Sequence, residues 1–227
     1  MSISECLAEV KTRIADAAKR AGRKPEDILL IAVTKGVRVD RIREAIDAGA
    51  HNLGESRVQE AIPKISTLGK TVSWHFIGHL QKNKVKYIVG EVDLIHSVDS
   101  IELSEEISRR AQKRGVVQDV LLEINISGEK GKFGVLPSEV SDTVKAITKF
   151  KDISLKGIMT VPPYSDNPED SRPYFRRMRE MRDEIVRTGL SPQDFRELSI
   201  GMSSDFEIGI EEGATLVRIG TAIFGQR

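Results

Sequence analysis

Short apolar runs alternate along the chain with longer segments whose apolar residues recur every three or four positions. Residues 28–33 read Ile-Leu-Leu-Ile-Ala-Val, as expected for a strand buried on both faces in a parallel sheet. Residues 2–20 instead place Leu7, Val10 and Ile14 on one face of a helix. Further strands are expected at residues 51–53, 73–77, 93–97, 117–126, 154–159, 197–200 and 216–219.

Segments with helical spacing separate these runs. They lie at residues 38–48, 56–68, 78–89, 100–115, from 138 onward, at 173–188 and at 203–212. Strict alternation of strands and helices implies parallel strands joined by right-handed crossovers. Eight such units can close into a barrel whose functional site lies at the carboxyl ends of the strands. A doubly wound open sheet is the main alternative.

Candidate chemistry at both ends of the chain favours the closed barrel, because its first and last strands are neighbours. We therefore predict an α/β fold, a single (β/α)8 TIM barrel with an extra N-terminal helix, spanning residues 1–227.

The chain of 227 residues carries 35 Lys and Arg against 34 Asp and Glu, a formal net charge of +1. This balance gives no support for a nucleic-acid or membrane-surface role. No apolar run approaches the ~20 residues that span a bilayer, and the amino terminus lacks a signal-peptide core. Cys6 is the single cysteine, so an internal disulfide is impossible. A cytoplasmic protein is expected, and a monomer, since no stretch stands out as an interface.

The last expected strand, residues 216–219, contains a cation and is followed directly by Gly220 and Thr221. A buried Arg218 is costly without a partner. Backbone N–H groups at Gly220 and Thr221 are free to face an anion. Ser203 opens the preceding expected helix, a second place where N–H groups and a hydroxyl favour negative charge. The stretch is typical of a phosphate cradle with an arginine beside it.

Lys35 follows the first buried strand. A neutral lysine amine can attack a carbonyl and form a Schiff base. In a closed barrel Lys35 lies beside Arg218, Gly220 and Thr221, so the expected ligand is a phosphorylated carbonyl compound. Position alone is more typical of a solvated lysine at a strand end; the phosphate cradle nearby reverses this and favours the functional interpretation.

Several runs carry a family resemblance. They are residues 32–35 (Ala-Val-Thr-Lys), 54–55 with 58–60, 74–81 with 83–84, 125–130, 157–160 with 162–163, 198–203 with Asp205, and 217–225 with Arg227. In order and spacing the chain resembles the pyridoxal phosphate homeostasis proteins, whose barrel is similar to the amino-terminal domain of bacterial alanine racemases. Two positions depart from the pattern: Ser56 stands where the family commonly has Asn, and Ile200 where it has Met.

The resemblance implies that Lys35 holds pyridoxal 5′-phosphate (PLP) as a Schiff base. It implies that Ser203 and the N–H groups of Gly220 and Thr221 hold the phosphate, with help from Ser199. It also implies that Arg218 faces the pyridine nitrogen. Ser56 leaves open any amide contact to the ring from that position.

Arg218 also bears on activity, because an arginine can only donate to the ring nitrogen. The nitrogen then stays unprotonated, and a neutral pyridine is a poor electron sink. We therefore expect a PLP-binding homeostasis protein without efficient catalysis, whose partners include PLP-dependent apo-enzymes. Alanine racemases resemble this arrangement and still work, with a tyrosine from a second domain; no tail is expected here after Arg227. An amino-acid racemase is the alternative, and a Schiff-base aldolase is a third.

Other polar residues fit these expectations less directly. The four histidines are scattered, so no metal site is expected, and His75 is expected to pack in the core. Glu123 and Asn125 share strand parity and could point into the top of the barrel. Residues 128–134 are expected to form a flexible surface loop, and Tyr164 to pack after the two prolines.

Overall fold

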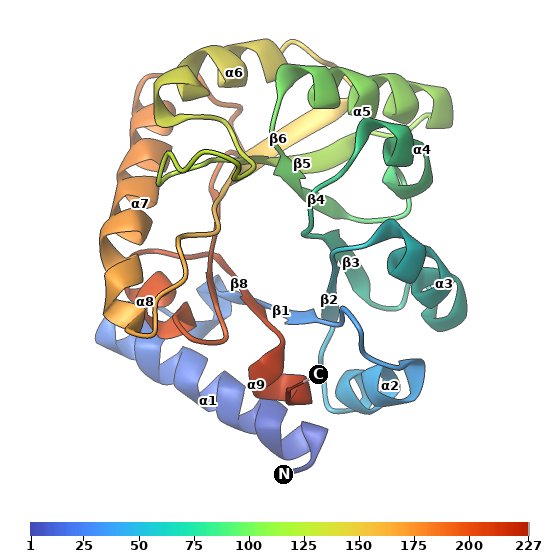
Figure 1. The fold of residues 1–227 in the computed structure, drawn as a ribbon, viewed down its shortest axis with the longest axis vertical. Helices are drawn as coiled ribbons and strands as arrows, with labels where there is room; N and C mark the ends of the chain where they lie inside the picture. Colours follow the sequence, from blue (N-terminus) through green and yellow to red (C-terminus); the bar gives the residue numbers. More distant parts are fainter. Residues whose placement is uncertain (227) are drawn as a thin grey trace.

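A closed barrel of parallel strands forms the centre of the molecule, and helices surround it (Figure 1). The structure is a computed structural model that describes residues 1–226, so Arg227 lies outside the described residues. The strands are β1 (Leu29–Val33), β2 (Asn52–Glu55), β3 (Ser73–Phe76), β4 (Leu94–Val98), β5 (Gln118–Glu123), β6 (Ile153–Met159), β7 (Glu197–Met202) and β8 (Leu216–Ile219).

The helices pack on the outside of the barrel. They are α1 (Ile3–Arg20), α2 (Val39–Asp47), α3 (Val58–Leu68), α4 (Val85–Ile88), α5 (Ile101–Arg114), α6 (Val140–Ile147), α7 (Arg172–Arg187), α8 (Phe206–Glu211) and α9 (Thr221–Phe224). The extra helix α1 packs against α8 and α9 and lies beside the closure of the barrel. No helix within residues 1–226 has the length and apolar character needed to cross a membrane.

The barrel closes between the first and last strands. β1 pairs with β8 in parallel, with Ile31 opposite Arg218 and Ala32 opposite Ile219. The predicted TIM barrel with an extra N-terminal helix is therefore confirmed, and the open sheet is excluded. The closure places the turn after β1 beside the turn after β8, although they belong to opposite ends of the chain.

Apolar packing occurs in two layers. The main core lies between the outer surface of the barrel and the helices, where Leu53, Phe76 and Ile95 are fully buried. A smaller cluster fills part of the barrel interior and includes Ile31, Leu121 and Met159. The rest of the interior is polar, which is costly unless each group has a hydrogen-bond partner.

Two predicted helices begin later than the sequence indicated. The helix expected over residues 78–89 is reduced to a 3-10 turn (Lys82–Lys84) and α4. A Cβ at Gly78 would lie 2.3 Å from the Ser56 carbonyl oxygen, so the chain here runs too close to a neighbouring segment to coil. The helix expected from Ser203 begins instead at Phe206, and Ser203 lies in the preceding turn.

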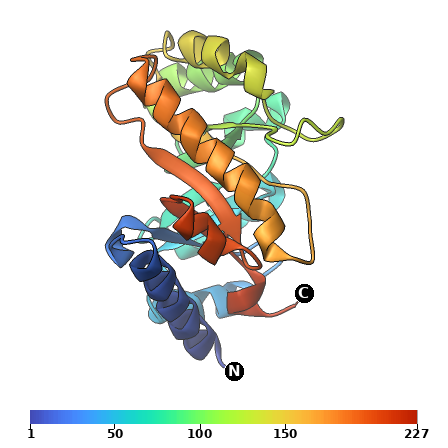
Figure 2. The same cartoon turned by 90° about the vertical axis from the view of Figure 1, so that its left-hand side faces the viewer.

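A cluster of ion pairs fixes α8 against α7. Glu212 is buried and accepts hydrogen bonds from Arg172 and Arg176, while Arg179 lies 3.0 Å from its carboxylate. Burial by itself would raise the pKa of Glu212, but the neighbouring guanidiniums together outweigh it, and the pKa is lowered. Figure 2 shows α7 lying across this side of the barrel, with α8 between α7 and α1. The turn that precedes α8 is thereby held at one edge of the barrel mouth.

Candidate functional site

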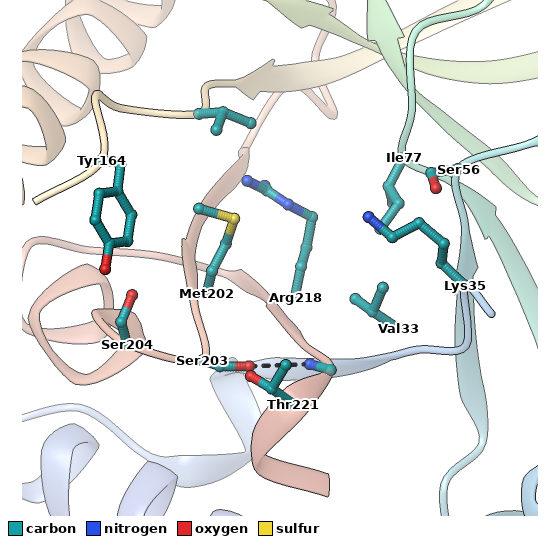
Figure 3. Close-up of a pocket in the computed structure, with 12 residues that line it drawn as sticks. Val33, Lys35, Ser56, Ile77, Tyr164, Met202, Ser203, Ser204, Arg218 and Thr221 are labelled. Atoms are coloured by element: carbon teal, nitrogen blue, oxygen red, sulfur yellow. Dashed lines mark hydrogen bonds between the residues drawn. The ribbon is translucent and has the colours of Figure 1, made fainter. Parts of the chain in front are cut away.

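A cavity of about 540 Å³ opens at the carboxyl ends of β1, β7 and β8 (Figure 3). This volume lies within the range of about 300–1,000 Å³ that is typical of small-molecule sites. Five predicted site residues line the cavity together: Lys35, Ser203, Arg218, Gly220 and Thr221. The two ends of the chain therefore contribute to one pocket, as the barrel closure required. Figure 3 shows Arg218 between Lys35 on one side and the turn of Ser203 on the other.

The anion-binding side of the pocket consists of two turns held together. The Gly220 N–H donates a hydrogen bond to the Ser203 hydroxyl oxygen, at 3.1 Å. The Ser203 proton is then free to donate to a ligand. Thr221 is exposed at the first position of α9, where N–H groups lack partners within the helix. Hydroxyls and backbone N–H groups thus face the same space, which suits a phosphate.

Gly201 directs the turn of Ser203. Its φ is +91°, a conformation that L side chains rarely adopt, and a Cβ there would lie 2.8 Å from the Phe206 Cα atom. The pairing of β7 with β8 is irregular between Ser199 and Met202, so the strand bends just before the pocket.

We expect Gly201→Ala to lower the free energy of unfolding by about 2 kcal/mol, from the unfavourable φ and the contact with Phe206. Because Ser203 follows two residues later, the variant is also expected to weaken anion binding in the pocket. Urea denaturation and phosphate binding measure the two effects. Gly189→Ala is a matched control, since Gly189 also has a positive φ, +69°, but nothing lies near its added Cβ and the pocket is remote. Equal loss of phosphate binding in both variants would contradict the assignment.

Arg218 extends from β8 into the barrel and is only 4% exposed. Its Nη1 donates to the Ser199 carbonyl oxygen at 2.8 Å and to the Ser199 hydroxyl at 2.5 Å, and its Nη2 donates to the Thr160 carbonyl oxygen at 2.9 Å. Burial lowers the pKa of the guanidinium to about 10, so the group stays charged at neutral pH. An arginine has five N–H donors. Within residues 1–226 these bonds leave the Nε proton and one Nη2 proton available to a ligand.

Ser199 lies apart from the other predicted site residues. It is fully buried on β7 and is absent from the lining of the cavity. Its hydroxyl contacts Arg218 and the His96 ring nitrogen Nδ1, the latter at 3.0 Å. The structure therefore connects Ser199 to the arginine rather than to the anion-binding turns.

Lys35 follows β1 and is exposed at the pocket (Figure 3). A buried ion pair fixes the backbone just before it. Lys64 of α3 donates to the Thr34 carbonyl oxygen at 2.7 Å and to Glu55 at 2.6 Å. The Thr34 hydroxyl donates to the same carboxylate, also at 2.6 Å. These bonds hold one side of the turn that carries Lys35.

Glu60 holds the other side of this turn. Its carboxylate accepts a hydrogen bond of 2.7 Å from the Gly36 N–H, which is the largest cause of the lowered pKa of Glu60. Glu60 also lies 3.4 Å from Lys64. The residue before Lys35 and the residue after it are therefore both fixed from α3.

Sequence reasoning missed the roles of Lys64, Glu55 and Glu60. In the sequence, Glu60 and Lys64 have the i,i+4 spacing of an ordinary surface pair on a helix. The sequence signal that could have revealed the buried ion pair was Glu55. This carboxylate ends a short buried strand, so it needs a cation nearby. The apolar lining of the pocket, which includes Val33, Ile77 and Met202, was also not predicted.

The remaining candidates divide between the pocket and its surroundings. Tyr164 lines the pocket but is 86% exposed and donates to Asp166, so it does not pack as expected. Glu123 and Asn125 do not line the pocket. The Asn125 side chain instead donates a hydrogen bond to the Glu129 carbonyl oxygen, which stabilises the loop that follows β5. His75 is buried in β3, as predicted.

Glu123 is buried near Arg218 and Asp99. Burial and the charge of Asp99 raise the pKa of its carboxyl to about 7, and the opposing effect of Arg218 is smaller. The group therefore titrates near neutral pH beside the arginine of the pocket.

The fold and the site place the chain among barrel proteins related to the amino-terminal domain of alanine racemases. The family model described as "Alanine racemase, N-terminal domain" matches residues 6–227. Alanine racemase from Corynebacterium glutamicum has the same fold, with a TM-score of 0.74 at 16% identity, covering 99% of this chain and 62% of that one.

Closer relatives define the family. The pyridoxal phosphate homeostasis protein of Aquifex aeolicus is 47% identical, covering 100% of this chain and 99% of its own length. That of Escherichia coli K12 is 38% identical, covering 99% of this chain and 97% of its own. The structure of PipY from Synechococcus elongatus with PLP bound has a TM-score of 0.85 at 32% identity, covering 99% of this chain and 100% of that one. The chain belongs to the family of pyridoxal phosphate homeostasis proteins.

The residues that line the pocket fit a ligand with the chemical groups of PLP. An anion site at Ser203 and Thr221, a lysine amine and a free arginine donor face one cavity with apolar walls. A planar molecule with a phosphate, a carbonyl and a ring acceptor meets a complementary group at each of these positions.

Proposed function

We propose that this chain binds PLP in the pocket at the carboxyl end of the barrel and holds it as a Schiff base on Lys35, as part of intracellular PLP homeostasis. The observation that carries the proposal is the common lining of the pocket by Lys35, Arg218 and Thr221, which come from opposite ends of the chain. The solved PLP complex of PipY supports it.

Each part of the pocket has a role in this proposal. The Ser203 hydroxyl and the Thr221 N–H bind the phosphate, and the Gly220 N–H holds the Ser203 hydroxyl in place. Val33 and Ile77 pack against the ring. The free N–H donors of Arg218 reach the ring nitrogen. When bound, PLP supplies an aldehyde for the lysine amine and a ring able to accept electrons.

The protonation of Arg218 favours binding over catalysis. With a pKa of about 10 the guanidinium donates at neutral pH and cannot accept. A ring nitrogen that accepts this bond carries no proton, and the ring then stabilises a carbanion poorly. We infer a carrier without efficient turnover, from which PLP-dependent apo-enzymes receive the cofactor.

The carrier acts as a monomer in the cytoplasm under this proposal, with residues 1–227 as one PLP-binding unit. Cys6 is the single cysteine and is free, so the fold contains no internal disulfide, which suits a reducing compartment.

Absorbance and covalent trapping test the proposal. Addition of PLP to the purified protein is expected to give a yellow chromophore, and borohydride is expected to fix one PLP on Lys35, located by peptide mass. Lys35→Arg is expected to abolish trapping, because a guanidinium does not form the Schiff base. Lys19→Arg, on the exposed outer surface of α1, is the control and is expected to leave trapping unchanged.

Trapping at another lysine, or none, would contradict the proposed site. Racemisation assays with the standard amino acids separate the carrier from a racemase. Rapid loss of optical activity with the wild-type protein would overturn the non-catalytic part of the proposal alone.

A further inference from the structure

A row of buried polar side chains crosses the barrel interior beneath the pocket. Arg218 Nη1 donates to the Ser199 hydroxyl at 2.5 Å. The Ser199 hydroxyl lies 3.0 Å from His96 Nδ1, and His96 Nε2 lies 3.0 Å from His75 Nδ1. All four side chains are buried, and they come from β8, β7, β4 and β3. These contacts form one continuous chain between four strands of the barrel.

The direction of the hydrogen bonds follows from Arg218. A guanidinium has no acceptor, so Ser199 must accept from it. The Ser199 proton then goes to His96 Nδ1, which leaves the proton of His96 on Nε2 to be donated to His75 Nδ1. The proton of His75 is consequently on Nε2. Every group between Arg218 and His75 is satisfied in this arrangement.

The opposite direction leaves one more buried group unpaired than the proposed direction, in which the His75 Nε2 proton alone lacks a partner within residues 1–226. If His96 Nδ1 donated to Ser199, the Ser199 proton would have no acceptor among residues 1–226, which costs about 1–3 kcal/mol. Burial lowers the pKa of His75 to about 4 and that of His96 well below its ordinary value. Both rings therefore carry one proton at neutral pH, as a chain of this kind requires.

The far end of the chain reaches a second cavity. His75 Nε2 is buried without a hydrogen-bond partner within residues 1–226. His75 lines a cavity of about 340 Å³ that includes Leu29, Asn52 and Leu216, each the first residue of its strand. This cavity therefore lies at the amino-terminal mouth of the barrel, opposite the pocket. The Nε2 atom itself is buried, so the far end of the chain is one unpaired polar atom beside this cavity.

We propose that Ser199, His96 and His75 are positioning residues for PLP binding, and that they orient Arg218 through a one-way chain of hydrogen bonds in which both histidines carry their proton on Nε2. This role rests on the proposed function. Ser199 accepts both Nη1 protons of Arg218, one at its carbonyl oxygen and one at its hydroxyl. The remaining donors of Arg218 are thereby directed toward the ligand. Ser199, assigned above to the phosphate by family resemblance, acts in this proposal through the arginine.

Nitrogen-15 NMR of the ligand-free protein tests the direction of the chain without PLP. Long-range ¹H–¹⁵N correlations distinguish the two neutral tautomers, and His75→Asn and His96→Asn spectra assign the signals. Both rings are expected as the Nε2–H tautomer at pH 7.5. An Nδ1–H tautomer at either ring would overturn the proposal.

Substitution of Ser199 tests the effect on Arg218. In Ser199→Ala both His96 and Arg218 lose a partner, so His96 is expected to become a mixture of tautomers and PLP binding to weaken about tenfold, as for a lost hydrogen bond to a charged group. Ser199→Thr retains the hydroxyl and is expected to restore both properties. Ser97→Ala is the matched control, since the Ser97 hydroxyl is buried on β4 without a hydrogen-bond partner.

The two measurements separate the possible failures. If the wild-type protein does not bind PLP, the proposed function fails while the tautomers still report on the chain. If Ser199→Ala leaves both the His96 tautomer and the PLP affinity unchanged, or if Ser97→Ala alters them equally, the positioning role is wrong.

Discussion

Lys64→Met is expected to lower the free energy of unfolding by about 3–5 kcal/mol, the usual cost of removing one member of a buried ion pair. Lys64 is 8% exposed and lies 2.6 Å from Glu55, whose side chain is almost completely buried. Without the ammonium, the Glu55 carboxylate keeps only the Thr34 hydroxyl as a hydrogen-bond donor within residues 1–226, where one of its oxygens already lacks a partner. Urea denaturation at pH 7.5 measures the loss.

Two further variants test the cause. Lys70→Met removes a lysine that lies on the surface, 3.7 Å from Glu91, and is expected to cost less than about 0.5 kcal/mol. The double variant Glu55→Leu with Lys64→Met leaves no buried charge, so it is expected to be less destabilised than Lys64→Met alone. A double variant that is as unstable as the sum of the single variants would show that the pair does not account for the loss.

All variants that lose the bond from Lys64 to the Thr34 carbonyl oxygen are expected to trap PLP on Lys35 more slowly.

Two buried groups are expected to give the protein opposite responses to acid. The pKa of His75 is about 4 in the folded protein and 6.5 ordinarily, so below pH 6.5 the unfolded chain binds the proton first. Stability from His75 is therefore lost as the pH falls from 6.5 to about 4, by roughly 3 kcal/mol in total. The pKa of Glu123 is about 7 in the folded protein and 4.5 ordinarily, so here the folded chain binds the proton first. Stability from Glu123 is lost as the pH rises from 4.5 to about 7, by a similar amount.

These effects nearly cancel between pH 4.5 and 6.5 in the wild-type protein, and single substitutions separate them. Relative to wild type, His75→Asn is expected to gain roughly 3 kcal/mol as the pH falls from 7 to 4, because asparagine does not titrate. Glu123→Gln is expected to gain roughly 3 kcal/mol relative to wild type as the pH rises from 4 to 8. Asp93 lies near His75, and Asp99 and Arg218 lie near Glu123, and these neighbours are present in all three proteins compared. Parallel stability curves for the three proteins would refute both assignments.

The barrel could be predicted because its signals are local and repeated. Buried strands such as residues 28–33 are continuous apolar runs, and each is followed by a segment with helical spacing. Predicting that the barrel closes required one more observation, namely that Lys35 and Arg218 lie at the first and last strands. The helices that were predicted too long failed where a contact from elsewhere in the chain prevails, as at Gly78 against Ser56.

The pocket was predicted in part. Lys35 and Gly220 follow strands and Arg218 lies one residue before the end of β8, in the region where a barrel gathers its functional groups. The partner of each group was not predictable, because pairs such as Lys64 with Glu55 or Ser199 with His96 are far apart in sequence and meet only in the closed fold. Ser199 was assigned by family resemblance alone, and its place inside the barrel follows from its register opposite Leu216 of β8, which only the structure gives.

The pairing of β1 with β8 also determines when the pocket can exist during synthesis. A chain emerging from the ribosome presents Lys35 early, but the turn at Gly220 follows only after β8 has been made. Until β1 and β8 pair, Lys35 does not face the turn at Gly220 and Thr221 that would hold the phosphate of a phosphorylated aldehyde. A nascent chain that still lacks β8 therefore has no complete pocket, and binding must wait until the last strand has paired with the first.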